Sequence, residues 1–303
     1  MKPVLQLTVL ACVFVSIVSC SKKNARPDSF VQATDSSSII NGEIVLADNE
    51  LGHSTVGLLV QIKNTWYQYC TGTIIAKNMI LTAAHCVAHT DPERSNVVIN
   101  FSLNTVDNAV QGDPVQKHIE DVRATFDTID VVGITAHPDY KGGVDYDMAI
   151  LRLKIDIPST RKIAEFLPQN YIDAVGNKLT LDGEIKDVTL LGFGLIDENT
   201  GESSSVLRKT IVPARFEGAV VVTDQTHGTG ACNGDSGGPA FVKIDDKNYL
   251  VGVTHGPYLD YKTCHEYGVY LNPNLYLDFI DKTMKKLDAM VIQGGQNFPA
   301  VFL

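Results

Sequence analysis

Short runs of β-branched and other apolar residues, separated by Gly, Asn and Asp, recur along this 303-residue chain. The runs that predict strands are Val56–Ile62, Gly72–Ile75, Ser95–Phe101, Ala149–Leu153, Val188–Gly192, Ala219–Val222 and Tyr249–Val253. Residues of this kind favour extended, paired backbone. Many short strands without helical segments between them indicate a sandwich or a barrel. The predicted fold class is therefore all-β.

One helix is predicted near the C-terminus. Its apolar residues repeat at helical spacing and share one face: Leu277, Ile280, Met284 and Leu287. Asn272 or Asn274 can cap this helix. The residues after the helix, 288–303, are interpreted as a tail.

The N-terminus has the pattern of an export signal. After Met1-Lys2 the apolar run Val4–Val18 is too short to cross a bilayer comfortably. It ends in Ile17-Val18-Ser19-Cys20, which resembles a bacterial lipobox whose cysteine is lipidated. The alternative is an ordinary secretory signal that ends near a cysteine. We predict a lipoprotein-type signal peptide over 1–20, with Cys20 as the lipidated residue.

A polar segment follows the signal. Residues 21–38 contain Pro27 and end in a serine run, with too few apolar residues to build a core. Such a segment is expected to be a mobile propeptide or tether.

Charge and cysteine usage restrict the function classes further. The formal net charge of −10 argues against a nucleic-acid partner. Outside the signal, four cysteines remain: Cys70, Cys86, Cys232 and Cys264. Four cysteines allow three pairings, and export favours disulfides over metal ligation. No metal or cofactor site is predicted.

Two segments carry the chemistry. The first is Leu81-Thr-Ala-Ala-His85-Cys86, and the second is Gly230-Ala-Cys-Asn-Gly-Asp-Ser236-Gly-Gly-Pro239. A serine hydroxyl becomes a useful nucleophile only when an imidazole takes its proton. The backbone N–H groups of Gly234 and Ser236 can point at one oxyanion because glycines surround the serine.

A third group must hold the tautomer of the imidazole. Asp147, in Asp147-Met-Ala-Ile-Leu, is the candidate. Asp145 is the alternative, but only Asp147 is followed by the Ala-Ile-Leu pattern.

In the order His85, Asp147, Ser236, these residues resemble the catalytic triad of the chymotrypsin/trypsin family, and the chain is identified as a secreted bacterial member of it. The resemblance implies a serine endopeptidase that works through an acyl-enzyme. It also implies two six-stranded antiparallel β-barrels with a C-terminal α-helix and the triad in the cleft between the barrels. The first barrel is expected over about 39–155 and the second over about 156–287, within a peptidase domain of 39–303.

The resemblance also implies a zymogen. Ile39-Ile-Asn-Gly42 matches the mature N-terminus of the family, whose freed amine pairs with the aspartate before the nucleophile, here Asp235. The expected activation bond is Ser38–Ile39, and an activating protease would be a partner. The implied disulfides are Cys70–Cys86, beside the histidine, and Cys232–Cys264, beside the specificity pocket.

Substrate-binding residues follow from the same resemblance. They are Gly230 at the floor of the pocket, Gly268 in its wall, and Thr254, His255 and Gly256 on the strand that binds substrate backbone. The family usually has an aromatic residue, often tryptophan, at the position of His255, so the wall of the cleft is altered. With no charge at Gly230, a cationic side chain would be buried unpaired. The expected preference is for Phe, Tyr, Leu or Met before the scissile bond.

Protein or peptide substrates are therefore the expected partners, with no nucleic acid and with a membrane contact only through a lipid on the propeptide. The expected location is secreted or in the cell envelope, and activation would release the enzyme from its anchor. The alternative is a non-catalytic binding or adhesion protein with the same fold. The retained triad and oxyanion glycine favour the enzyme.

Overall fold

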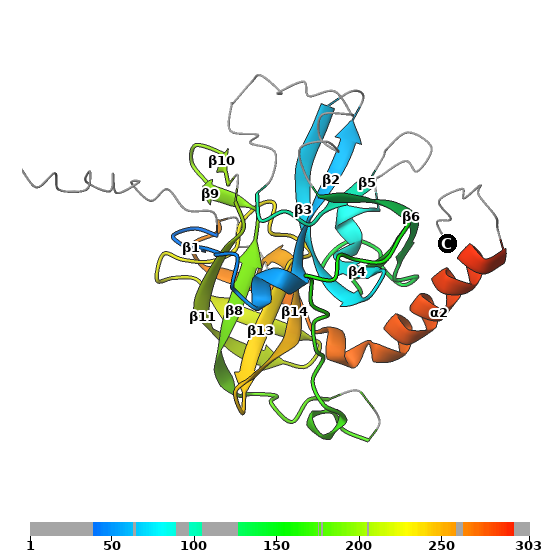
Figure 1. The fold of residues 1–303 in the computed structure, drawn as a ribbon. Helices are drawn as coiled ribbons and strands as arrows, with labels where there is room; N and C mark the ends of the chain where they lie inside the picture. The colour runs from blue at the N-terminus through cyan, green and yellow to red at the C-terminus, as the bar shows by residue number, and fades with distance from the viewer. Residues whose placement is uncertain are drawn as a thin grey trace, which may run out of the picture. The chain divides into compact units, whose positions relative to one another are not determined.

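Six strands in the first half of the chain close into an antiparallel barrel, which contains β2 (Thr55–Ile62), β3 (Thr65–Ala76), β4 (Met79–Thr82), β5 (Val97–Asn100), β6 (Thr128–Ala136) and β7 (Ala149–Leu153). Their order around the barrel is β2-β3-β4-β7-β6-β5 (Figure 1). This computed structural model describes residues 39–62, 65–88, 97–104, 127–174, 176, 178–204, 206–258 and 263–293. The interior of the barrel is filled by buried aliphatic side chains such as Leu58, Ile80 and Leu151.

A second antiparallel barrel follows, which contains β8 (Ile185–Gly192), β11 (Arg208–Glu217), β12 (Val220–Asp224), β13 (Pro239–Ile244), β14 (Lys247–Pro257) and β15 (Tyr267–Leu271). The order β11-β12-β15-β14-β13-β8 is closed by pairing of β8 with β11. The short strand β1 (Glu43–Ile44) adds to β11, and β9 (Leu195–Asp197) pairs with β10 (Glu202–Ser203). The predicted pair of six-stranded barrels is confirmed.

Every predicted strand overlaps an observed one, and Ser95 lies outside the described residues. The strands β6 and β11, which are among the longest, were not predicted from the sequence. In β11 buried and more exposed positions alternate from Val212 to Phe216, whereas in β6 only Ile129 and Ile134 are buried. An antiparallel strand with one face open to solvent needs no continuous apolar run.

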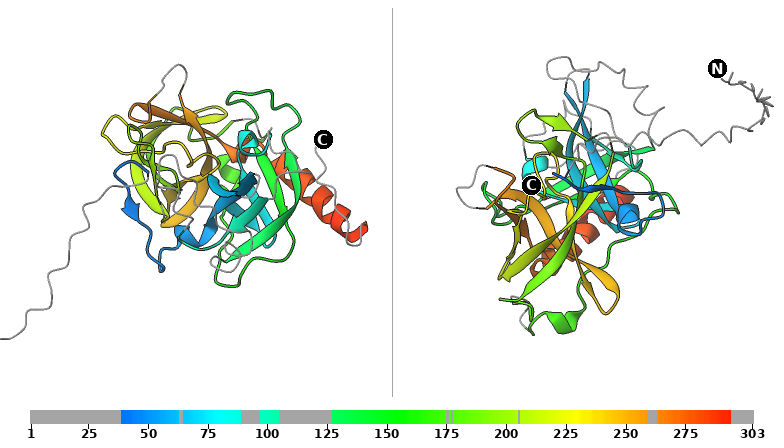
Figure 2. Two further views of the ribbon diagram at one scale, coloured as in Figure 1. Left: turned by 90° about the horizontal axis from the view of Figure 1, so that it is seen from above. Right: turned by 90° about the vertical axis from the view of Figure 1, so that its left-hand side faces the viewer.

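The helix α2 (Leu277–Gln293) follows the second barrel in the chain but packs on the first (Figures 1 and 2). Ile280 and Leu287 are buried in the same cluster as the first barrel's core. Arg152 Nε in β7 donates to Asp288 Oδ1 at 3.0 Å. The helix prediction is therefore confirmed, and α2 fastens the end of the chain to the first barrel.

The predicted cap of α2 was wrong. The Asn272 side chain accepts from Asn274 N and caps the 3-10 turn η4 (Pro273–Leu275) that precedes α2. The Asn274 side chain accepts from Leu167 N and donates to Leu250 O. The two asparagines therefore stabilise the turn η4 and tie it to Leu167 and Leu250, and neither caps α2.

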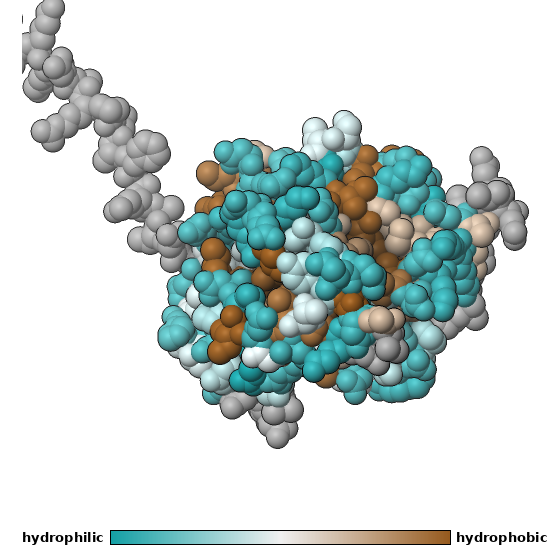
Figure 3. Space-filling view, turned by 90° about the horizontal axis from the view of Figure 1, so that it is seen from below, coloured by the Kyte–Doolittle hydropathy of each residue, from teal (hydrophilic) through white to brown (hydrophobic). Residues whose placement is uncertain are grey.

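The surface seen from below is mainly hydrophilic, with apolar residues showing between polar ones (Figure 3). Among the described residues, no helix is both long and apolar enough to span a bilayer. The predicted signal peptide, Cys20 and the tether lie within 1–38, outside the described residues, as does most of the tail.

Candidate active site

His85 lies in the 3-10 turn η2 (Ala84–Cys86), directly after β4. The disulfide Cys70–Cys86 ties this turn to β3. Asp147 holds His85 at two points: the His85 backbone N–H donates to Oδ1 at 2.8 Å, and His85 Nδ1 lies 2.6 Å from Oδ2. The imidazole is therefore fixed with Nδ1 against a carboxylate and with its Nε2 edge free for another partner.

Asp147 ends the loop before β7 and is only 1 % exposed, whereas Asp145 is exposed. Of the two aspartates, Asp147 is thus the one that contacts His85. Burial raises the pKa of Asp147, but hydrogen bonds from His255 and His85 outweigh burial and leave the pKa below its usual value. The carboxylate stays ionised beside the imidazole.

His255 contacts the same carboxylate. Its Nδ1 lies 2.5 Å from Asp147 Oδ2, and its ring meets the His85 ring edge-on with centroids 5.5 Å apart. The sequence predicted His255 only as part of the cleft wall, and nothing in its neighbours indicated this contact. One atom of each side chain that could bind a metal ion lies within 4.8 Å of the other two. The hydrogen bonds of both imidazoles to Asp147 Oδ2 explain these short distances.

Ser236 lies in the loop before β13, and residues of the first barrel form hydrogen bonds with this loop. Thr71 N donates to Ser236 O at 2.8 Å, and Thr71 Oγ1 donates to Gly234 O at 3.1 Å. A Cβ on Gly237 would stand 2.0 Å from Thr82 Oγ1, so the close approach of the two barrels requires glycine there. Thr71 is a site residue that the sequence analysis missed.

The two expected oxyanion donors lie in this loop. Gly234 has a φ of +96°, a conformation that favours glycine. Among the described residues, neither Gly234 N–H nor Ser236 N–H donates to another protein atom. No hydrogen bond between described residues joins the Ser236 hydroxyl to the His85 ring. Such bonds often form fully only when substrate is bound.

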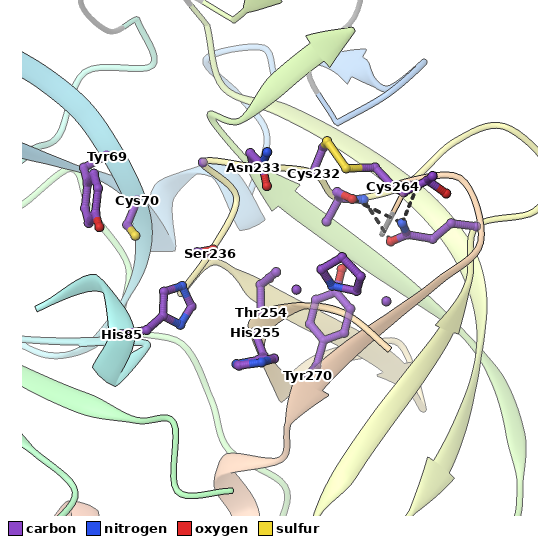
Figure 4. A pocket seen from close by; sticks show the side chains of 17 residues that line it. Tyr69, Cys70, His85, Cys232, Asn233, Ser236, Thr254, His255, Cys264 and Tyr270 are labelled. Carbon is purple, nitrogen blue, oxygen red and sulfur yellow. Dashed lines mark hydrogen bonds between the residues drawn. A yellow bond between two sulfur atoms is a disulfide. The ribbon is translucent and has the colours of Figure 1, made fainter. Parts of the chain in front are cut away.

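A cavity of about 400 Å³ opens beside these residues. His85, His255 and Ser236 lie around one part of it, and the Cys232–Cys264 disulfide lies along another (Figure 4). Tyr270 contributes an aromatic wall, and burial raises the pKa of its hydroxyl, so this side chain is neutral. The cavity thus combines the candidate catalytic groups with a largely uncharged recess.

Gln225 fills the space beside Gly230 at the expected floor of the pocket. Its Nε2 donates to Ala231 O and Cys264 O at 3.1 and 2.7 Å. Its Oε1 accepts from Ala231 N and Thr223 Oγ1 at 3.0 and 3.3 Å. Both N–H groups of the amide are therefore used within the protein, and its oxygen accepts from Ala231 N and shares the single proton of Thr223 Oγ1 with Gly268 O.

The other expected substrate-binding residues line the same cavity: Thr254, Gly256 and Gly268. Thr254 Oγ1 donates to Gly238 O, which links β14 to the loop that carries Ser236. Gly230 is not among the residues that line the cavity, because the side chain of Gln225 lies beside it and takes its place in the lining. Gln225 lies five residues upstream of Gly230 in a loop, and no motif marked it.

Ile39 and Asp235 are both fully buried. Ile40 N donates to Gly230 O at 2.9 Å, which places the start of the described chain against the second barrel. The carboxylate of Asp235 accepts from Gly194 N and Cys232 N, each at 2.8 Å. Burial, only partly offset by these bonds, raises the pKa of Asp235 to about 7.

Comparison with known proteins identifies the family. The family model described as Trypsin matches residues 48–280. Brachyurin from Leptuca pugilator is 31% identical over 206 residues, which are 61% of this chain and 80% of that protein. Chymotrypsin-like elastase family member 1 from Canis lupus familiaris is 28% identical over 208 residues, or 62% of this chain and 70% of that protein.

Serine protease Hayan from Drosophila melanogaster is 27% identical over 237 residues, which are 70% of this chain. The match spans only about a third of Hayan, 34% of its length. The family model covers most of the present chain and includes the segments of all three candidate catalytic residues. The chain therefore belongs to the trypsin family of serine endopeptidases.

Proposed function

We propose that this protein hydrolyses peptide bonds through His85, Asp147 and Ser236, and that it is made as a zymogen. The observation that carries the proposal is the two-point contact of Asp147 with His85, with Ser236 on the same cavity. The backbone N–H groups of Gly234 and Ser236 donate to no other described protein atom. This supports the proposal, because an oxyanion needs hydrogen-bond donors that are free to bind it.

The proposed reaction follows from the tautomer. Because Nδ1 of His85 donates to Asp147, Nε2 carries a lone pair and can accept the proton of Ser236. Ser236 Oγ then attacks the scissile carbonyl, and the amides of Gly234 and Ser236 stabilise the oxyanion. His85 passes the proton to the leaving amine, and water attacks the acyl-enzyme with His85 again as the base. The ionised Asp147 stabilises the imidazolium that forms in each half.

We propose that the residue before the scissile bond is apolar or aromatic, such as Phe, Tyr, Leu or Met. Gln225 supports this preference because both N–H groups of its amide already donate within the protein, so neither is left for a substrate side chain. Gln225 carries no charge, so a buried Arg or Lys side chain would meet no counter-ion from it or from Gly230. Protein or peptide substrates follow from the family.

We propose that cleavage of Ser38–Ile39 activates the protein. The buried carboxylate of Asp235 accepts two N–H bonds but forms no ion pair with a described cation. A freed ammonium group on Ile39 would supply that missing charge. Pairing of this kind would hold the loop of Gly234 and Ser236 in its active form.

The location is also a proposal. Two disulfides fit an oxidising compartment outside the cytoplasm. We propose that Cys20 is lipidated and that cleavage before Ile39 removes the anchor together with the propeptide. Detergent phase partition checks this: the full chain is expected in the detergent phase and the Ile39 form in the aqueous phase. An Ile39 form that stays in the detergent phase would refute release.

The test of function is digestion of a peptide library by protein that begins at Ile39, with Ser236→Ala and His85→Ala as controls. Cleavage after apolar residues that disappears in both controls is the expected result. Cleavage after Arg or Lys would keep the triad and overturn the pocket assignment. A folded but inactive Ile39 form would favour a non-catalytic protein with this fold.

A further inference from the structure

We propose that His255 is a positioning residue that fixes the carboxylate of Asp147, so that two imidazoles instead of one hold this carboxylate. This inference rests on the proposed function of His85, Asp147 and Ser236. It assigns to His255 a role in catalysis that is separate from its place in the wall of the cleft.

The first support is the set of donors around Asp147. Oδ1 accepts the His85 backbone N–H, and Oδ2 accepts from Nδ1 of both His85 and His255. Asp147 is 1 % exposed, so water cannot readily replace a lost donor. His255 therefore provides one of three hydrogen bonds that hold a buried charge in place.

The second support is the backbone around His255. In the pairing of β14 with β15, Thr254 faces Tyr270 and Gly256 faces Val269, with a register shift between them. His255 is the extra residue of this bulge. Bulges beside active sites commonly redirect a side chain. The bulge gives His255 a direction that a regular strand would not, and its Nδ1 meets Asp147.

The hydroxyl of Thr254, next to His255, does not donate to Asp147. Thr254 Oγ1 donates to Gly238 O at 2.9 Å. Among described residues, the side chains that hydrogen-bond to the Asp147 carboxylate are therefore the two imidazoles. Burial and, after it, the charge of this carboxylate raise the pKa of Tyr140, and no hydrogen bond is found between the two side chains.

The contact also determines that Nδ1 of His255 carries a proton. An ionised carboxylate only accepts, so Nδ1 of His255 must carry a proton, as Nδ1 of His85 does. His85 and Asp147 come from the first barrel, and His255 comes from β14 of the second. The bond thus also fixes the two halves of the cleft relative to each other, where the proton of Ser236 must be transferred.

Two substitutions of His255 distinguish a role in positioning Asp147 from a role in the wall of the substrate cleft. His255→Phe keeps an aromatic ring but removes the donor. His255→Asn loses the ring, but its side-chain N–H can lie close to the position of Nδ1. His227→Asn, at an exposed histidine away from the cavity, is the matched control.

The measurements are kcat and KM for a chromogenic peptide, and the rate at which a small arylsulfonyl fluoride inactivates the Ile39 form. The sulfonyl fluoride reports the reactivity of Ser236 with little contact to the strand that carries His255. We expect His255→Phe to lower kcat and the inactivation rate by roughly tenfold or more, the effect of losing a hydrogen bond to a charged group. His255→Asn should recover most of this loss, and His227→Asn should match the unchanged protein.

A change in KM alone, with equal inactivation rates in all forms, would overturn the inference and leave His255 as a wall residue. His85→Ala, run in parallel, separates this failure from that of the proposed function. If His85→Ala keeps full activity, the triad itself is wrong.

Proton NMR of the Ser236→Ala protein, with and without His255→Asn, tests the geometry without any measurement of activity. Imidazole N–H groups bonded to a carboxylate resonate far downfield. Two such signals are expected, and His255→Asn should remove one of them and keep the other. A single signal that survives in His255→Asn would overturn the shared carboxylate.

Discussion

The side chain of Gln225 occupies the place that a β-carbon on Gly230 would need, with Gln225 Cδ only 2.2 Å from that position. At the expected floor of the pocket, Gln225 therefore lines the cavity and Gly230 does not. Gly230 leaves room, and Gln225 fills it with an amide whose hydrogen bonds all stay within the protein.

Gly230→Asp alone is expected to fail as a route to Arg/Lys specificity. The new Cβ would overlap Gln225, and the displaced amide would leave Ala231 O and Cys264 O unpaired. We expect lower stability, by about 1–3 kcal/mol, and no efficient cleavage after Arg or Lys. Urea unfolding and a set of peptides that differ only in the residue before the scissile bond check both outcomes.

The double variant Gly230→Asp with Gln225→Gly removes the overlap and places a carboxylate at the floor. Cleavage after Arg or Lys should then appear, and the two substitutions should be strongly non-additive. Equal Arg/Lys activity in the single and double variants would show that Gln225 does not control the floor.

Thr71 should matter for rate more than for binding. Thr71→Val keeps the shape but removes the hydroxyl that donates to Gly234 O and accepts from Phe193 N at 3.3 Å. Because Gly234 N–H is a proposed oxyanion donor, kcat should fall by roughly tenfold with little change in KM. Thr71→Ser keeps the hydroxyl and serves as the control. Identical kcat values for the valine and serine variants would exclude this role.

Asp235 makes the stability of the uncleaved chain depend on pH. The pKa of Asp235 is about 7 in the folded chain, against an ordinary value of 3.8. Between these pH values the folded chain holds a proton that the unfolded chain has released, so the free energy of unfolding falls as pH rises from about 4 to 7. The titration of Asp235 lowers the free energy of unfolding by up to about 4 kcal/mol over this pH range.

Urea unfolding of a Ser236→Ala chain that starts at residue 21 measures this effect without self-cleavage. Asp235→Asn in the same chain should remove the contribution, and the form that begins at Ile39 should reduce it, because an ammonium group lowers the pKa of the carboxyl. Parallel pH curves for all three proteins would contradict the assignment.

The sequence was most informative where a residue has a recognisable neighbourhood. His85 follows an Ala-Ala pair after a strand, and Asp147 precedes the apolar strand β7, so the pairing of these two residues could be predicted without coordinates. The choice of Asp147 over Asp145 agrees with the observed contact. The two barrels could be predicted because the same family segments occur in order along the chain.

The contacts that the sequence did not predict depend on details of the backbone. His255 reaches Asp147 through a one-residue bulge in β14, and a bulge shifts the alternation of side chains without any marker in composition. Gln225 reaches Gly230 from a loop five residues away, and its amide gives no periodic signal. Nothing in the sequence around Thr71 in β3 indicates that the loop of Gly234 and Ser236 packs against it.

The central claim is that the groups at His85, Asp147 and Ser236 form a working peptidase. The most direct measurement is the turnover of an apolar peptide substrate by protein beginning at Ile39, compared with Ser236→Ala and Asp147→Asn. We predict clear turnover in the unchanged protein, none above background in Ser236→Ala, and a loss of about 10⁴-fold in kcat for Asp147→Asn. Equal turnover in Ser236→Ala and the unchanged protein would contradict the account.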